Sequence, residues 1–195
     1  MSTQIKQVIF VGLAVVLIAF MVFMLRPQGT PATSQGAPYQ QTGAATEPQV
    51  DPSLTQRINT LQQQVQTDPK NEKALTELGA LYFQVQQFAQ AADVYNRVVD
   101  LDPKNVDVHI DLGRAYFYQG MSSTAIKEFR KAVELDPKKV DAHYNLALAL
   151  SHSAPPDVDA AVASWKEVIK LAPDSDQAKK SQSFIDAYTK QQPQK

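Results

Sequence analysis

Hydrophobic and polar positions follow a helical period through most of the chain, starting at residue 51. The first apolar stripe consists of Leu54, Ile58, Leu61 and Val65. Apolar side chains three or four residues apart lie on one face of a helix, so this stripe predicts an amphipathic lead helix over residues 51–68. The Asp51-Pro52 pair is typical of a helix start, because proline is well tolerated in the first turn.

Prolines divide the rest of the pattern at regular intervals. They are Pro69, Pro103, Pro137 and Pro173, with spacings of 34, 34 and 36 residues. A fixed period of this size indicates stacked repeats, here over residues 72–105, 106–139 and 140–175. Each unit is predicted to contain two helices. In the second unit Gly120 ends the first helix, Ser122 or Ser123 caps the next one, and Asp136-Pro137 stops it.

The segment before residue 51 has a different character. After a short flank at residues 1–7, residues 8–25 form a run of 18 residues with no charged or hydrogen-bonding side chain. As a helix it would span roughly 27 Å, close to a bilayer core of about 30 Å, so we predict an uncleaved membrane anchor over a shorter signal peptide. Residues 26–50 are rich in Pro, Gly, Gln and Thr, which predicts a disordered linker.

Six positions recur in each of the three units. They are Leu78, Gly79, Tyr82, Ala91, Tyr95 and Pro103, then Leu112, Gly113, Tyr116, Ala125, Phe129 and Pro137, then Leu146, Ala147, Leu150, Ala161, Trp165 and Pro173. This pattern resembles the tetratricopeptide repeat (TPR) family, in which Leu-Gly and Tyr belong to the first helix and Ala, an aromatic residue and Pro to the second. The usual Trp of the first helix is replaced by Leu75, His109 and His143.

The resemblance implies an all-α fold, a TPR α-solenoid of three helix-turn-helix repeats. Because a solenoid needs polar outer layers at both ends, we expect the lead helix at one end and a capping helix and tail over residues 176–195 at the other. In addition to the transmembrane helix, we expect eight helices. The small residues Gly79 and Gly113 are expected to face Ala91 and Ala125, where paired helices approach most closely.

Composition and charge exclude several function classes. The net charge is −1 with no Lys/Arg-dense segment, which argues against a nucleic-acid partner, and the absence of cysteine excludes thiolate chemistry. His109 and His143 sit one repeat apart, but they have no third matched ligand and are read as packing residues. The sequence places Ser151, His152 and Asp157 in one turn, yet a triad is defined by geometry and not by proximity in sequence. We predict no enzyme activity, cofactor, metal site or small-molecule substrate.

Apolar and aromatic side chains also occupy first-helix positions that the repeat core does not require. The candidate groove residues are Phe83, Ile110, Arg114, Phe117, Tyr118, Tyr144 and Leu148. In TPR proteins such positions line a concave groove that holds a peptide or helix of a partner, and the resemblance implies the same here. The alternative is that these aromatics only pack between adjacent first helices.

Together these features predict a membrane-anchored interaction scaffold with a protein or peptide partner, acting in assembly of an envelope complex. A lead helix before a Leu-Gly-Tyr repeat also resembles the TPR subunits of bacterial cytochrome c maturation, which implies an alternative role in binding apocytochrome. Lys6 and the charge-poor linker favour a single-pass protein of the bacterial inner membrane with its TPR domain on the periplasmic side.

Overall fold

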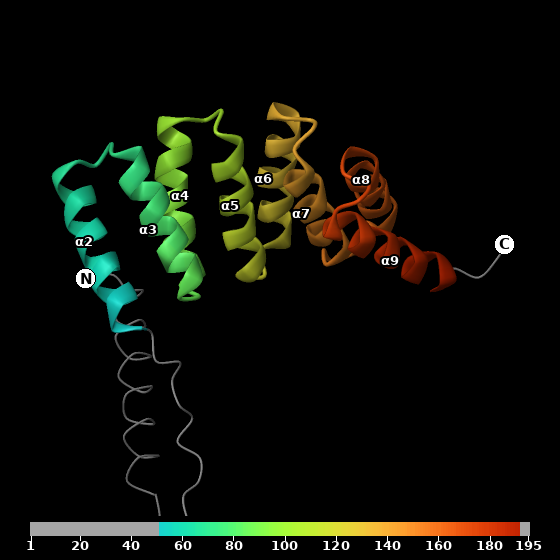
Figure 1. Cartoon of the computed structure of the whole chain (residues 1–195), viewed down its shortest axis with the longest axis horizontal. Helices are drawn as coiled ribbons and strands as arrows, with labels where there is room; N and C mark the ends of the chain where they lie inside the picture. Colours follow the sequence, from blue (N-terminus) through green and yellow to red (C-terminus); the bar gives the residue numbers. More distant parts are fainter. Residues whose placement is uncertain (1–50, 192–195) are drawn as a thin grey trace, which may run out of the picture. The chain divides into compact units, whose positions relative to one another are not determined.

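The computed structural model describes residues 51–191, which form a row of helices in chain order (Figure 1). The helices are α2 (Pro52–Thr67), α3 (Glu72–Gln84), α4 (Phe88–Leu101), α5 (Val106–Tyr118), α6 (Ser122–Leu135), α7 (Val140–Ser151), α8 (Val158–Leu171) and α9 (Asp176–Gln191). Across these residues there are eight helices and no strand, which confirms the predicted all-α solenoid.

The predicted flank, anchor and linker over residues 1–50 lie outside the described residues. Between residues 51 and 191, no helix combines the length and the apolar character that a membrane span requires.

Polar side chains at the helix starts explain where several helices begin. Asp51, Asn71, Asn105 and Asp157 each accept a hydrogen bond from a backbone N–H in the first turn of the helix that follows. Such caps satisfy N–H groups that have no partner inside the helix. The predicted serine cap of α6 is wrong, since Met121 occupies that position and makes no side-chain cap bond.

The helix ends in the first two repeats use a left-handed residue. Gly120 has φ of +77° after α5, which confirms its predicted role in ending that helix. The equivalent residue one repeat earlier is Gln86, with φ of +60°. Glycine adopts this conformation without steric cost, whereas glutamine adopts it only at a steric cost from its Cβ.

The packing order defines two layers of helices. Each helix contacts the next one in the chain, and α5 in addition contacts both α3 and α7. The first helices of the three repeats therefore form one inner layer. Tyrosines tie each unit to the one before it. The hydroxyl of Tyr82 accepts a hydrogen bond from Gln62 on the lead helix at 2.6 Å, and that of Tyr116 accepts one from Asn96 of the first repeat at 2.8 Å.

The close approach inside each repeat differs from the sequence-based expectation. A Cβ added at Gly79 would lie 2.6 Å from Cε1 of Tyr95, and one at Gly113 would lie 2.6 Å from Cε1 of Phe129. The nearest side chain to each glycine is therefore an aromatic ring, which the expected contact with alanines did not include. Each glycine leaves room for the face of a buried aromatic ring on the second helix.

The last helix covers an aromatic core at the end of the solenoid. Trp165 on α8 is fully buried, and the rings of Phe184 and Tyr188 on α9 stack against it at centroid distances of 5.0 and 5.7 Å. Ala178 and Ile185 are buried on the same helix. At the other end α2 buries Ile58, Leu61 and Val65 of the predicted stripe.

Candidate functional site

The inner layer carries all the candidate groove residues. Phe83 lies on α3, Ile110, Arg114, Phe117 and Tyr118 lie on α5, and Tyr144 and Leu148 lie on α7. Residues four apart on one helix share a face, so Ile110, Arg114 and Tyr118 form one row along α5. Tyr144 and Leu148 form the matching row on α7. Contact between α5 and α7 brings the two rows together.

Between these rows lies a cleft of about 470 Å³, the α5–α7 cleft. Its lining residues are Asp107, Ile110, Asp111, Arg114, Tyr118, Asp141, Tyr144, Asn145, Leu148 and Gln177. Five of the seven predicted groove residues are thus in one hollow. Ile110 is only 6% exposed and forms part of the floor, whereas Tyr118 is 58% exposed at the end of α5.

The two remaining groove residues join the cleft through Tyr118. The Phe83 ring meets the Tyr118 ring edge-on at 5.4 Å, and the Arg114 guanidinium lies 4.6 Å from the Phe83 ring centre. Phe117 meets Tyr118 at 5.9 Å. The predicted residues therefore make one connected surface, although Phe83 and Phe117 also pack against the core clusters beneath them.

Sequence reasoning missed two aromatic members of this surface. Phe88 at the start of α4 stacks on Tyr118 at 5.0 Å, and the His152 ring lies 5.7 Å from Phe117. Phe88 belongs to a second helix, where the repeat pattern gave no reason to look for groove residues. An aromatic side chain at the first residue of that helix, beside the turn, was the available signal.

Acidic side chains surround the cleft. Lys139 pairs with Asp107 at 2.7 Å, Arg114 with Asp111 at 3.2 Å, and the Gln177 amide donates to Asp141 at 2.6 Å. Burial raises the pKa of Asp111, and the nearby Asp107 and Asp141 carboxylates raise it further, while Arg114 acts in the opposite direction. Burial also raises the pKa of Tyr144.

The two repeat-related histidines each bond to the backbone. Nε2 of His109 lies 3.1 Å from the carbonyl oxygen of Pro103, and Nε2 of His143 lies 3.0 Å from that of Pro137. His109 in addition contacts Glu128 through Nδ1 at 2.8 Å. In residues 51–191, no group of three His, Cys, Asp or Glu side chains is arranged to hold a metal ion. These histidines tie the start of a first helix to the loop before it.

The Ser–His–Asp set in the α7–α8 turn is engaged with backbone groups. Ser151 Oγ lies 3.0 Å from Nδ1 of His152, but the hydroxyl also donates to the carbonyl of Leu148 at 2.9 Å. The Asp157 carboxylate accepts the Ala160 N–H and caps α8. The carboxylate therefore serves the helix start.

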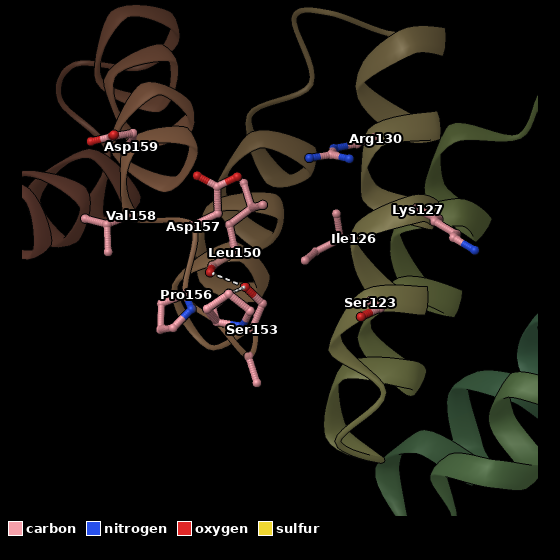
Figure 2. A pocket seen from close by; sticks show the side chains of 12 residues that line it. Ser123, Ile126, Lys127, Arg130, Leu150, Ser153, Pro156, Asp157, Val158 and Asp159 are labelled. Carbon is pink, nitrogen blue, oxygen red and sulfur yellow. Dashed lines mark hydrogen bonds between the residues drawn. The ribbon is translucent and has the colours of Figure 1, made fainter.

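A second hollow, of about 660 Å³, lies between α6 and the loop before α8 and is drawn in Figure 2. Arg130 points into it from α6, and Ser153 on the loop donates to the carbonyl of Leu150 at 2.8 Å. It contains none of the predicted groove residues. Prolines and backbone-bonded side chains form the loop wall, and Ser123, Lys127 and Arg130 line the opposite wall on α6, so this hollow is polar and has no aromatic surface.

Comparison with known proteins agrees with this geometry. A family profile described as TPR repeat matches residues 81–120 and 113–151. Residues 81–151 therefore match TPR repeats, and they lie within a described part that is an all-helical solenoid of eight helices. This finding confirms the predicted repeat type. A search of curated proteins gives no match.

Solved structures share the same architecture. A crystal structure of MamA protein has a TM-score of 0.61 at 22% identity, covering 71% of this chain and 78% of that one. MamA from Desulfovibrio magneticus RS-1 has a TM-score of 0.58 at 22% identity, covering 64% and 69%. The first TPR of Spaghetti (RPAP3), bound to the HSP90 peptide SRMEEVD, has a TM-score of 0.56 at 23% identity, covering 63% and 96%. At these identities the likeness concerns the fold alone.

Proposed function

We propose that this protein is a membrane-tethered scaffold whose inner TPR face holds a peptide or helix of a partner protein. The observation that carries the proposal is the connected surface of aromatic side chains and cleft on α3, α5 and α7. Tyr118 joins its two parts and stays 58% exposed, although it is large and apolar. Exposed apolar surface that adjoins a cleft is typical of an interaction site.

The fold supports the same function class. TPR repeats serve as interaction scaffolds, and a structural neighbour, the first TPR of Spaghetti, is bound to a peptide. That peptide, SRMEEVD, has three acidic residues and one Arg. The α5–α7 cleft has acidic side chains of its own, so a segment of that charge would meet repulsion here. We therefore infer a partner segment of different composition.

Interface energy concentrates in a few aromatic or Arg anchors, each worth about 2 kcal/mol or more when truncated to Ala. Tyr118 and Tyr144 are the anchors we assign, because both line the cleft and neither is a buried core residue, although Tyr144 also packs against the core beneath it. Replacing both with Ala should weaken partner binding by more than about tenfold, since about 1.4 kcal/mol corresponds to one decade.

The test uses the full chain in non-ionic detergent as bait for cross-linking and mass spectrometry of bound proteins. The double variant should lose the partner while keeping helical circular dichroism. Leu101→Ala is the matched control, since Leu101 is an exposed apolar residue on α4, outside the cleft. Retention of the partner by the folded double variant would contradict the proposal.

The membrane tether and its orientation are the second part of the proposal. The apolar run at residues 8–25 and the position of Lys6 support an anchor with the TPR domain on the periplasmic side of a bacterial inner membrane. Ser34→Cys provides a single thiol in this cysteine-free chain. An impermeant thiol reagent should label it in intact cells. Labelling only after lysis would place the domain in the cytoplasm.

The narrower role in cytochrome c maturation stays a prediction. It rests on the order of elements, a lead helix before the repeats, and it would act through the same inner face. Co-purification of an apocytochrome with the full chain, lost in the Tyr118/Tyr144 double variant, is the result that this role requires. Recovery of unrelated envelope proteins would favour the general scaffold.

A further inference from the structure

Three carboxylates from two helices line the α5–α7 cleft, and Arg114 is the only cationic side chain among the lining residues. The carboxylates belong to Asp107 and Asp111 on α5 and to Asp141 on α7. Three positive charges would be needed to neutralise them, and the lining residues supply one. The lining therefore carries excess negative charge next to an apolar floor.

The contacts of each carboxylate show which of them are left to a ligand. Asp107 pairs with Lys139, which lies outside the cleft lining. Asp141 accepts a hydrogen bond from the neutral amide of Gln177 and forms no direct ion pair within residues 51–191, although its charge acts at longer range on Lys139. Asp111 has Arg114 as its counter-ion, but that guanidinium also lies over the Phe83 ring. Asp111 and Asp141 are thus incompletely neutralised.

The environment of Asp111 adds to this imbalance. Its side chain is 33% exposed, and burial together with the neighbouring carboxylates raises its pKa despite Arg114. A carboxylate in this position is less stable as an anion than it would be in water. A cation placed beside it would remove part of that cost, because opposite charges attract more strongly where water is partly excluded.

The rest of the lining suits the stem of a long cationic side chain. Ile110 and Leu148 supply aliphatic surface, and the rings of Tyr118 and Tyr144 supply aromatic faces. Lys and Arg bury their methylene groups along apolar surface and keep the charged end with polar partners. Aromatic faces also attract cations. The cleft volume of about 470 Å³ is enough for one or two such side chains.

We propose that the α5–α7 cleft takes a Lys or Arg side chain of the partner segment, with its charged end between Asp111 and Asp141 and an apolar neighbour on Ile110 and Leu148. This inference rests on the proposed function and adds the chemistry of the partner. It distinguishes this groove from one that binds acidic segments or a terminal carboxylate, because the carboxylates of the α5–α7 cleft would repel such ligands.

The test measures fluorescence anisotropy of labelled peptide pools against the full chain in non-ionic detergent. Three pools have equal length and equal apolar content, and their remaining positions hold Lys and Arg, Glu and Asp, or Gln. The basic pool should bind at least about tenfold more tightly than the acidic pool, and its advantage should shrink at high salt, as expected for charge complementarity. Equal binding of all three pools would overturn the inference.

Variants then locate the effect in the cleft. Asp111→Asn with Asp141→Asn should weaken binding of the basic pool by about fivefold or more. The matched control is Asp93→Asn with Asp174→Asn, which makes the same change in net charge at exposed positions outside the cleft. An equal loss in both pairs would mean a long-range charge effect and would contradict the site.

The outcomes also separate this inference from the proposed function. If pools bind, and Tyr118→Ala with Tyr144→Ala abolishes binding while the aspartate pair has no effect, the inner face is the interaction surface and the cationic assignment is wrong. If the basic pool fails to bind at millimolar concentration, the assignment is likewise overturned. Loss of binding in both sets of variants, with helicity retained, supports the inference.

Discussion

Replacing Gly113 with alanine tests how each repeat is held together. The new Cβ would lie 2.6 Å from Cε1, 2.8 Å from Cδ1 and 2.9 Å from Cζ of Phe129. These distances are far below ordinary van der Waals contact between carbons, which is about 3.5–4.0 Å. The ring is 1% exposed and surrounded by core residues, so α5 and α6 must separate or the ring must leave its position.

The expected magnitude is a difference of two effects. Overpacking in a filled core costs about 1–3 kcal/mol. Alanine is favoured over glycine inside a helix by about 1 kcal/mol, which partly offsets that cost. We expect Gly113→Ala to lower the free energy of unfolding by about 1 kcal/mol, the middle of the resulting range of about 0–2 kcal/mol. For a domain of this size each kcal/mol lowers Tm by roughly 2–4 °C.

The assay is urea and thermal unfolding followed by circular dichroism, with a double-mutant cycle as control. In a Phe129→Leu background the flexible side chain can move away from the Cβ, so Gly113→Ala should be neutral or stabilising by up to about 1 kcal/mol. The change of sign is the decisive observation. If alanine at position 113 destabilises both backgrounds equally, the ring contact is not the reason for the glycine.

Three further predictions concern the turn, the end cap and the cleft. Gln86→Gly should stabilise the protein by about 0.5–1 kcal/mol in urea titrations, because Gln86 holds a left-handed φ that Gly120 supplies one repeat later; no gain would mean that the turn carries no strain. Deleting residues 174–195 should lower Tm and cause association in light scattering, since α9 covers Trp165; an unchanged Tm and a monomer would contradict this capping role. Asp111→Asn should leave the free energy of unfolding at neutral pH equal or higher, because the pKa of Asp111 is raised in the folded state and its anion is disfavoured there. That gain should disappear as pH falls through the raised pKa, where the wild-type carboxyl is protonated; a variant less stable than wild type at neutral pH would show that the ion pair with Arg114 dominates.

Much of the fold was predictable because its determinants are local. Each helix-stopping proline and the glycine at position 120 act within one or two helical turns, and the stripe on α2 acts along a single helix; the structure has helices with these limits. Local signals were less secure at the start of α6, where serine was expected to cap the helix. Met121 takes that position, directly after the left-handed Gly120, and makes no side-chain cap bond.

The candidate site was predictable only in part. The row of Ile110, Arg114 and Tyr118 follows from helical spacing, and a repeat places a similar row on the next first helix. The stack of Phe88 on Tyr118 joins a second helix to the first helix of the following repeat. The distance between the Phe88 and Tyr118 rings depends on how two repeats are rotated against each other. No spacing of residues within one repeat specifies that rotation.

The sequence by itself determined the helices, their order and the repeat type, because hydrophobic period, caps and breakers act between neighbours in the chain. Only the tertiary structure decided which side chains meet across helices. It placed Asp111 and Asp141, 30 positions apart, in the lining of one cleft, and it set the rings of Tyr95 and Phe129 against the repeat glycines. These contacts between helices depend on the stacking angle between repeats and on the fit of whole helix faces. Both are collective properties of the packed solenoid.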